Sequence, residues 1–387
     1  MKLIHKILLG TLAVSSCAAI IAAISIDFTK TTLIYSEGSS SVLPLLTQLS
    51  NHYKASDVIA NAGGSSVGIN SALNLKKHLG MSSRAVNYDH NLKLVENKAT
   101  NYMKWKDHEM KSFTMAWDGI AIIYKLNESN KDLVLNKSNI ATLYKAFAGF
   151  DVVSFKDLDN QLPDIKITPY SRTGGANASG TTEAFIKNNP FIKLKDVDHN
   201  VYEAMHTGVY GKLTKNTEEA NSQAWIAIRT DNINGAVGFL STGYVLKNIK
   251  EINDNGFKVA YLNDPNTNKA TLPFDIKDNK TTINVGNTYK WYRPFNLVFS
   301  LNQKQNESVK DFIWWLMFDK QAQTIIEEAG FIPLSWNQKR SMFKKDAILD
   351  NETSLNNNLE LAKKLFFVSD LDLLDQREKK VFGAVEN

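Results

Sequence analysis

The sequence predicts an α/β protein built from more than one domain. Its 387 residues exceed the ~150 residues of a typical domain, and 43% of them are apolar, enough for extended hydrophobic cores. Strand-like runs at residues 31–35 and 58–62 are each followed by a Gly/Ser loop and then by helical periodicity. A third unit of this kind begins with the strand-like run 164–170. The alternation of strand, polar loop and helix is typical of α/β folds.

The two N-terminal loops place hydroxyl groups at the start of predicted helices. The first loop, 37–44, ends at Pro44, which a first helical turn tolerates because the missing N–H would have no partner there. A flexible linker has the same Gly-Ser-Ser-Ser composition, but Pro44 between a strand and a periodic segment favours a helix start. The second loop, 63–66, precedes another helix, and that unit ends at 80–84. These loops are rich in hydroxyls and poor in carboxylates, as an anion site built from neutral donors requires.

The stretch 171–185 combines three features that bind anions. Arg172 supplies a charge and a planar fork of donors. Ser179 is a good N-cap for a helix predicted at 181–187, and Gly180 lets the backbone approach a ligand closely. The free amides of a helix start favour negative charge. We therefore predict that this stretch holds a tetrahedral oxyanion.

The remaining elements surround these units. Helices are expected at 88–111, 142–149, 224–228 and 308–329, the last strongly amphipathic. Strands are expected at 113–124, within 234–244 after an Asn-Gly turn, at 259–262 and at 291–299. Asp118-Gly119 predicts a kink or bulge in the first of these strands, and a crossing between lobes is placed there. Residues 263–282 are expected to form a surface excursion, and 340–387 a charged helical appendix that packs on the body or binds a partner.

Charge and motif content argue against several function classes. The 45 basic and 40 acidic residues are interspersed and leave a net charge of +5, whereas a nucleic-acid binder concentrates basic residues on one face. No Walker A lysine precedes residues 180–182 and no Cys/His cluster predicts zinc, so neither cofactor nor metal is expected. Residues 64–68 match the G-x-S-x-G nucleophile elbow, with Ser66 as nucleophile, but nothing marks His199 or His206 as its base. A serine hydrolase is therefore the weaker alternative to a non-enzymatic protein. Arginine is scarce, so each one requires a geometric reason: Arg84, Arg172, Arg229, Arg293, Arg340 and Arg377.

The N-terminal segment 1–29 is a signal or anchor segment. Basic residues precede an apolar run, 7–26, which contains the single cysteine, Cys17. Residues 14–17 have the pattern of a lipobox, which makes Cys17 a candidate lipidation site. The run is also ~20 residues long, enough for an uncleaved signal anchor that spans the bilayer. Both alternatives place the remaining chain on the extracellular face of the plasma membrane.

Several motifs, each weak alone, occur in an order and spacing that resemble one family. They are 38–44, 64–66, 80–84, 118–121, Arg172 with 179–181 and Phe185, 235–239, Arg293-Pro294, and Phe312 through Gln321 to 330–333. In this combination the chain resembles the phosphate-binding protein, the substrate-binding receptor, of bacterial phosphate ABC transporters. The resemblance extends from residue 33 to residue 334.

The resemblance implies an α/β periplasmic-binding-protein-like fold of type II, with two lobes, a hinge and an interlobe ligand cleft. Its expected parts are residues 30–117 plus 289–335 as the first lobe, 118–288 as the second lobe and 336–387 as a C-terminal helical appendix. It also implies phosphate contacts from Ser40, Ser41, Ser65, Ser83, Arg172, Ser179, Gly180 and Thr181. The implied role is a non-enzymatic receptor, expected to be a monomer, that delivers inorganic phosphate to the membrane permease subunits of an ABC importer.

Two departures from the family pattern leave questions open. Ser83 stands where some members carry Asp, which accepts a hydrogen bond from a protonated phosphate oxygen and repels sulfate. A receptor for another tetrahedral oxyanion is therefore an alternative. The gap between Arg172 and Ser179 is longer than usual, so either Arg172 is displaced or the loop 173–178 bulges and contributes amides. A surface interaction protein on the same scaffold would bind no phosphate.

Overall fold

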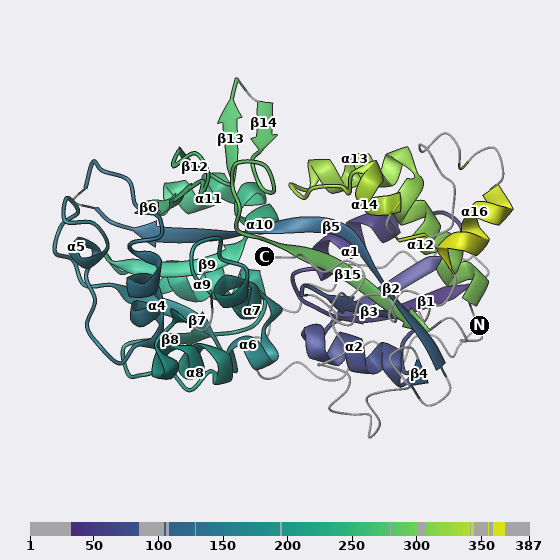
Figure 1. Cartoon of the computed structure of the whole chain (residues 1–387), viewed down its shortest axis with the longest axis horizontal. Coiled ribbons are helices and arrows are strands. Elements are labelled where there is room, and N and C mark those ends of the chain that lie inside the picture. The colour runs from purple at the N-terminus through teal and green to yellow at the C-terminus, as the bar shows by residue number, and fades with distance from the viewer. Residues whose placement is uncertain are drawn as a thin grey trace, which may run out of the picture.

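The computed structural model of the chain describes residues 32–84, 104–105, 108–127, 129–193, 196–278, 280–300, 306–340, 342–343, 355 and 359–367. Within these residues, helices and strands form two lobes that lie side by side (Figure 1). Two long strands, β5 (His108–Lys125) and β15 (Tyr292–Ser300), run between the lobes. The predicted two-lobe α/β fold is confirmed.

Strand β5 is shared by both lobes. Its first part pairs antiparallel with β15, and its second part, from Ile120 to Tyr124, pairs antiparallel with β9 (Ala236–Ser241). The path through the sheet is β2 (Asp57–Ala62), β1 (Leu33–Gly38), β3 (Leu79–Ser82), β15, β5, β9, β7 (Thr168–Arg172) and β8 (Lys215–Thr217). Strands β4 (Lys104–Trp105) and β10 (Phe257–Val259) pair with β5 beside this path.

Backbone hydrogen bonds connect three chain segments where β5 changes its partner. Trp117 and Ile332 exchange two of them, at 2.9 and 3.0 Å, and the Ile120 amide donates to the Trp291 carbonyl at 3.0 Å. The pairing of β5 passes from β15 to β9 between Gly119 and Ile120. We propose that the boundary between the lobes lies here, close to the expected residue 118.

The first lobe packs its helices against β1, β2, β3 and β15. They are α1 (Leu43–His52), α2 (Ser65–Leu73), α12 (Asn306–Phe318), α13 (Lys320–Glu328), α14 (Trp336–Arg340) and α16 (Leu359–Phe366). One hydrophobic cluster, with Leu46, Phe113 and Phe312 fully buried, joins all of these helices except α2 to the sheet, and α2 packs on Val298 of β15 in a separate small cluster.

The second lobe buries both faces of its part of the sheet. Its helices are α4 (Ile140–Ala148), α5 (Phe155–Leu158), α6 (Gly175–Ala178), α7 (Gly180–Lys187), α8 (His199–Thr207), α9 (Asn221–Asp231), α10 (Thr242–Lys247) and α11 (Ile249–Asp254). Along β5, Ile120 and Ile122 belong to one apolar cluster and Ala121 and Ile123 to another, because successive side chains point to opposite faces. The ring of Phe185 on α7 stacks between neighbouring aromatic rings, 4.4 Å from Phe239 and 5.2 Å from Trp291.

Four expectations about single elements need correction. The predicted helix 308–329 is two helices, because Asp319 caps the second one by accepting from the Gln321 amide at 2.8 Å. Of the predicted helix 88–111, residues 108–111 begin β5, and residues 85–103 lie outside the described part of the chain. The irregularity in β5 is not at Asp118-Gly119 but at Met115, which the pairing with β15 skips. The expected strand 259–262 is divided between β10 and β11 (Tyr261–Asn263), which also pairs with β6 (Val134–Leu135). The excursion 263–282 is largely exposed, as expected, and contains strands β12 (Ala270–Thr271), β13 (Phe274–Lys277) and β14 (Lys280–Ile283).

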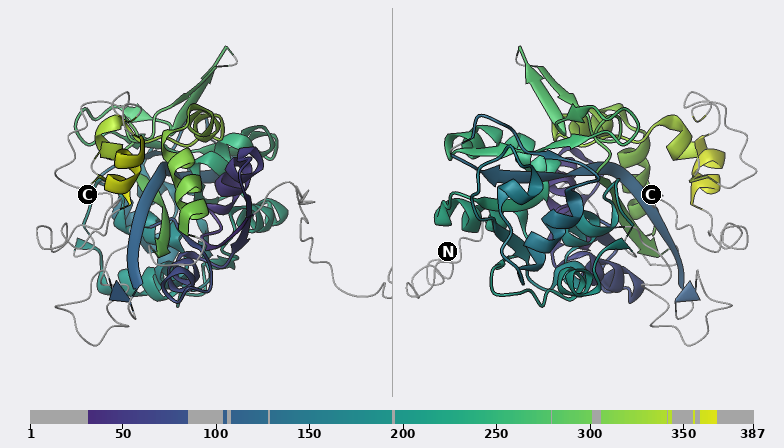
Figure 2. Two further views of the ribbon diagram at one scale, coloured as in Figure 1. Left: turned by 90° about the vertical axis from the view of Figure 1, so that its right-hand side faces the viewer. Right: turned by 60° about the vertical axis from the view of Figure 1, so that its left-hand side comes forward.

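Two peripheral features complete the fold. The β13–β14 hairpin projects from the body in all three orientations (Figures 1 and 2). Of the helices in the described residues, none has the length and apolar character needed to cross a bilayer. Cys17 and the rest of segment 1–29 lie outside the described residues.

Helix α16 of the C-terminal appendix is part of the first-lobe core. Phe366 is fully buried and stacks on Phe113 of β5, with ring centroids 5.0 Å apart. Lys111, also buried, donates to the carbonyls of Phe366 (2.6 Å) and Met342 (3.1 Å). A buried ammonium is stabilised only when such acceptors replace water. The charge of Lys111, part of the predicted helix 88–111, is thus satisfied by backbone carbonyls inside the lobe.

The packing of α16 predicts unequal effects of two substitutions on the same helix. Phe366→Ala should lower the free energy of unfolding by about 3–5 kcal/mol, because it removes a buried ring and leaves a cavity. Leu359→Ala, at a position that is 43% exposed, should change it by less than about 1 kcal/mol. Chemical denaturation of the two variants measures both values, and equal losses would mean that α16 does not dock as described.

Candidate functional site

The eight predicted site residues all lie on loops and helix starts between the two lobes. Ser40 and Ser41 follow β1, Ser65 begins α2, Ser83 follows β3, Arg172 ends β7, and Ser179, Gly180 and Thr181 form the start of α7. Strands β1, β2 and β3 run parallel in the first lobe, and β7, β8 and β9 in the second. The carboxyl ends of such strands are the usual position for ligands in α/β sheets.

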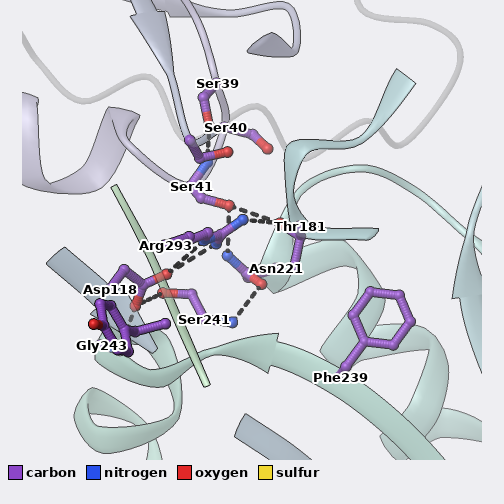
Figure 3. Close-up of polar contacts among 12 residues, drawn as sticks. Ser39, Ser40, Ser41, Asp118, Thr181, Asn221, Phe239, Ser241, Gly243 and Arg293 are labelled. Atoms are coloured by element: carbon purple, nitrogen blue, oxygen red, sulfur yellow. Dashed lines mark hydrogen bonds and ion pairs between the residues drawn. The ribbon is translucent and has the colours of Figure 1, made fainter. Parts of the chain in front are cut away.

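One polar cluster joins the first lobe to the second directly (Figure 3). The hydroxyls of Ser41 and Thr181 are 3.0 Å apart, and the Asn221 amide donates to Ser41 Oγ at 3.3 Å. Arg293 Nη1 donates to Thr181 Oγ1 at 2.9 Å. These four side chains come from the β1 loop, α7, α9 and β15. The contact therefore depends on both lobes and on a strand that runs between them.

Ser65 and Ser83 form a second group of hydroxyls beside the start of α7. Ser65 Oγ lies 3.3 Å from Ser83 Oγ and accepts from the Ser83 amide at 3.1 Å. A Cβ added to Gly180 would lie 2.4 Å from Ser83 Oγ and 2.6 Å from Ser65 Oγ. Only glycine allows the α7 backbone to come so close to the first lobe.

Ser179 caps α7 as predicted from its position. Its side chain accepts from the Thr182 amide at 3.1 Å, which satisfies one of the free amides of the first turn. The Phe185 ring, buried in the core of the second lobe, holds the helix in place. Thr181, which contacts Ser41, lies in the first turn of α7, where the helix dipole favours negative charge.

The long gap between Arg172 and Ser179 contains an additional turn of helix, α6. Gly174 and Gly175 have φ angles of 77° and 57°, in the left-handed region. A Cβ on Gly175 would lie 2.5 Å from the Gly208 amide nitrogen, so this turn packs tightly against the end of α8. The loop therefore accommodates its extra length as a partly buried helical turn, and Arg172 lies at the end of β7.

Arg172 directs most of its donors to the second lobe. Its Nη2 donates to Asn221 Oδ1 at 3.0 Å and to the Phe239 carbonyl at 3.3 Å, and its Nη1 to the Glu218 carbonyl at 3.3 Å. Nε is buried without a hydrogen-bond partner among the described residues. Burial lowers the pKa of Arg172 to about 10, an effect opposed by Glu219, so the guanidinium remains charged at neutral pH.

Sequence reasoning missed a buried ion pair that supports this site. Arg293 donates to Asp118 Oδ2 through Nε (3.0 Å) and Nη2 (2.9 Å), and both side chains are fully buried. Ser241 Oγ (2.9 Å) and the Gly243 amide (3.4 Å) donate to Asp118 Oδ1. Burial raises the pKa of Asp118, and these donors oppose that shift. The scarcity of arginine was a signal for Arg293, but nothing local in the sequence pairs it with residue 118.

Two further site residues, Asn221 and Glu219, also escaped the sequence analysis. Asn221 links Arg172 to Ser41 and accepts from the Ser241 amide at 3.1 Å. Ser40 Oγ donates to Glu219 Oε1 at 3.5 Å. Burial raises the pKa of Glu219, opposed first by Arg172 and then by the Ser179 hydroxyl, Arg293 and Ser40. Both residues lie in a polar segment with no motif to mark them.

A contact at the edge of the site involves the candidate nucleophile, Ser66. Arg84 Nη1 pairs with Glu183 Oε2 of α7 at 2.8 Å, and its Nη2 donates to Ser66 Oγ at 2.7 Å. Ser66 Oγ in turn donates to the Asn177 carbonyl at 3.3 Å. No histidine is among its hydrogen-bond partners in the described chain. Ser66 thus contacts both lobes, and within the described residues its Oγ bonds to a guanidinium and a carbonyl, not to a general base.

The Asp118–Arg293 pair predicts a large loss of stability when one partner is neutralised. Asp118→Asn leaves a buried guanidinium without its counter-charge and should lower the free energy of unfolding by about 3–5 kcal/mol. The control is Asp254→Asn, which removes an exposed ion pair with Lys250 and should have little effect. Denaturant titration of both variants measures the loss in the free energy of unfolding. Small and similar losses in the two variants would contradict a structural role for the buried pair.

The raised pKa of Glu219 predicts a pH-dependent gain from its neutral isostere. The folded protein binds this proton more tightly than the unfolded chain, so stability is lost as pH rises from the usual 4.5 through the raised pKa. Glu219→Gln avoids this loss. Its thermal midpoint should exceed that of the wild type at neutral pH, and the difference should vanish as pH falls toward 4.5. A difference independent of pH would contradict the assignment.

Comparison with known proteins identifies the family. A model of the PBP superfamily domain matches residues 28–320. An uncharacterized lipoprotein of Mycoplasma genitalium is 34% identical over 340 residues, which cover 81% of this chain and 85% of that protein. The matched part of the chain includes every predicted site residue from Ser40 to Thr181.

Solved structures share the fold at low sequence identity. A putative phosphate ABC transporter substrate-binding protein from Clostridium perfringens, with bound phosphate, matches with a TM-score of 0.53 and 22% identity, covering 79% of this chain and all of that one. A phosphate-binding protein from Stenotrophomonas maltophilia matches with a TM-score of 0.56 and 15% identity, covering 81% of this chain and 94% of that one. With its two lobes and shared central strands, the chain belongs to the PBP superfamily and has the type II binding-protein fold that its sequence predicts.

Proposed function

We propose that this protein is a receptor that captures inorganic phosphate outside the cell and delivers it to an ABC importer. The observation that carries this proposal is the interlobe cluster in which Ser41, Thr181 and Arg293 meet. Hydroxyls, a capped helix start and two buried arginines are the donors that a tetrahedral oxyanion requires. The phosphate-binding proteins that share its fold support the choice of ligand.

The proposed phosphate contacts come from both lobes. Ser40, Ser41, Ser65 and Ser83 would contact phosphate from the first lobe, and Arg172 with Ser179, Gly180 and Thr181 from the second. Arg293 would add a second positive charge close to Thr181. An anion that contacts both sets favours the closed arrangement of the lobes, because it binds that arrangement better than an open one. No residue in this set is asked to make or break a covalent bond, so the role is that of a receptor, not an enzyme.

The proposed location is the outer face of the plasma membrane. The Mycoplasma genitalium relative is described as a lipoprotein, which favours lipidation of Cys17 over an uncleaved anchor helix. A monomeric receptor held at the membrane in this way would dock on the permease subunits of a phosphate ABC transporter. A receptor for another oxyanion, such as sulfate, would use the same donors and remains the alternative.

Calorimetric titration of the full-length chain with phosphate tests this function. Arg172→Ala should weaken binding roughly 10- to 100-fold, because a hydrogen bond from a charged group to a desolvated anion is lost. Ser179→Ala should cost less, since it removes a neutral hydroxyl and a helix cap. Arg229→Ala, which removes an exposed arginine paired with Glu251 in the same lobe, is the matched control and should bind normally. Unchanged affinity in Arg172→Ala would refute the site, and no phosphate binding by the wild type would refute the function.

A further inference from the structure

A second contact between the lobes lies near the interlobe cluster but uses none of its side chains. Arg84 follows β3 of the first lobe, and its Nη1 donates to Glu183 Oε2 on α7 of the second lobe at 2.8 Å. Both side chains are only 8% exposed, so the pair is almost fully withdrawn from water. Glu183 lies two residues after Thr181, and residues at this spacing lie on different sides of a helix. The ion pair is therefore separate from the Ser41–Thr181 contact.

The position of Arg84 is fixed within the first lobe. Its backbone carbonyl accepts a hydrogen bond from Asn296 Nδ2 of β15 at 2.8 Å. Its Nη2 donates to Ser66 Oγ at 2.7 Å, and that hydroxyl donates to the Asn177 carbonyl of the second lobe at 3.3 Å. Because Arg84 is held on the first lobe, its guanidinium loses Glu183 when the lobes separate.

Glu183 has another cation within its own lobe. Lys187, one turn further along α7, donates to Glu183 Oε1 at 2.6 Å, and its side chain is 32% exposed. This pair is local to one helix, so it does not depend on the orientation of the lobes. Separation of the lobes thus leaves the carboxylate with a partner and returns the Arg84 guanidinium to water.

The consequence for closure follows from the cost of burying a charge. Closure transfers the Arg84 guanidinium from water into the interface, and the carboxylate of Glu183 offsets that cost. A complete buried ion pair adds little stability over an apolar contact, whereas a buried charge without its partner is strongly unfavourable. The complete pair therefore permits the lobes to close, and an incomplete pair opposes closure.

We propose that Glu183 is a positioning residue for lobe closure, which neutralises Arg84 and so lets the lobes close firmly on an anion that neither residue touches. This inference rests on the receptor function proposed above. An anion held by both lobes binds only the closed arrangement fully, so its measured affinity falls with the population of that arrangement. The loss should appear as faster release, because the pair forms as the lobes meet around an anion already captured.

Calorimetry with phosphate and the release of labelled phosphate, both on the full-length chain, test this role. Glu183→Gln keeps the shape of the side chain but leaves Arg84 buried without a counter-charge, so Kd should rise at least about tenfold, with faster release. Adding Arg84→Met to this variant should return Kd to within about threefold of the wild type, because no buried charge remains. A purely long-range effect of charge predicts the opposite of both results, because loss of a carboxylate near an anion strengthens binding and loss of an arginine weakens it.

Lys187→Met is the matched control. It removes the other cation from the same carboxylate, but the pair that it breaks lies within one helix. Closure buries no unpaired charge in this variant, because Arg84 keeps Glu183. Its phosphate Kd should therefore stay within about threefold of the wild type, with an unchanged rate of release.

The outcomes separate this inference from the function on which it rests. Wild-type protein that binds no phosphate contradicts the receptor function. Wild-type binding with an equal or tighter Kd in Glu183→Gln contradicts only the role of Glu183, and so does a double variant that binds no better than Glu183→Gln.

A charge-reversed pair tests the same contact if circular dichroism shows that Glu183→Gln does not fold. Arg84→Glu alone places two carboxylates opposite each other in the closed arrangement. Combining it with Glu183→Arg restores an ion pair of reversed polarity, which should bind phosphate at least about tenfold more tightly than Arg84→Glu alone. Equal affinities of these two variants would overturn the inference.

Discussion

The buried ion pair between Asp118 and Arg293 is the interaction on which the site depends. Asp118 lies on β5 and Arg293 on β15, the two strands that run between the lobes, at the point where β5 changes its partner. Two of the guanidinium nitrogens bond to Asp118, which leaves Nη1 directed at Thr181. A buried pair of this kind adds little net stability over apolar packing, but it fixes a geometry that a lone arginine could not hold.

The electrostatics of the cluster follow from this arrangement. Two arginines, Arg172 and Arg293, are buried in this region, and burial, with a smaller contribution from Arg293, lowers the pKa of Arg172 to about 10. Asp118 neutralises the charge of Arg293 in a buried ion pair. Glu219, which accepts a hydrogen bond from Ser40, stabilises the charged form of Arg172. The donors that face a ligand are therefore hydroxyl groups, the start of α7 and the two guanidinium groups. Such a preorganised set of donors stabilises a negative charge more strongly than water-exposed lysines would.

The parts of the site that could be predicted from the sequence are those marked by a short local sequence pattern. A Gly/Ser loop between a strand and a helix is visible within ten residues, and so is the N-cap at Ser179. The partners of those residues could not be predicted, because Asp118 and Arg293 are separated by 175 positions and nothing nearby marks either as paired. The helix predicted at 88–111 was wrong at Lys111 for a similar reason: Lys111 lies on β5, and distant carbonyls of the C-terminal segment accept hydrogen bonds from it inside the core. The division of the chain into two lobes could be predicted only because several motifs occur in the order and spacing of one known family.

The crossing point would couple anion binding to the relative orientation of the lobes in the proposed receptor. Thr181 accepts a hydrogen bond from Arg293 on β15, the strand that crosses between the lobes, and its hydroxyl contacts Ser41 of the first lobe. One turn further along α7, Phe185 stacks on Trp291, which precedes β15. Helix α7 therefore contacts the crossing at two positions, through Thr181 and through Phe185. Any rotation of the lobes that separates Ser41 from Thr181 also changes the position of the α7 amides relative to the first-lobe serines. In the receptor function proposed above, an anion held by both sets of donors would stabilise one relative orientation of the lobes, because it binds that orientation better than others.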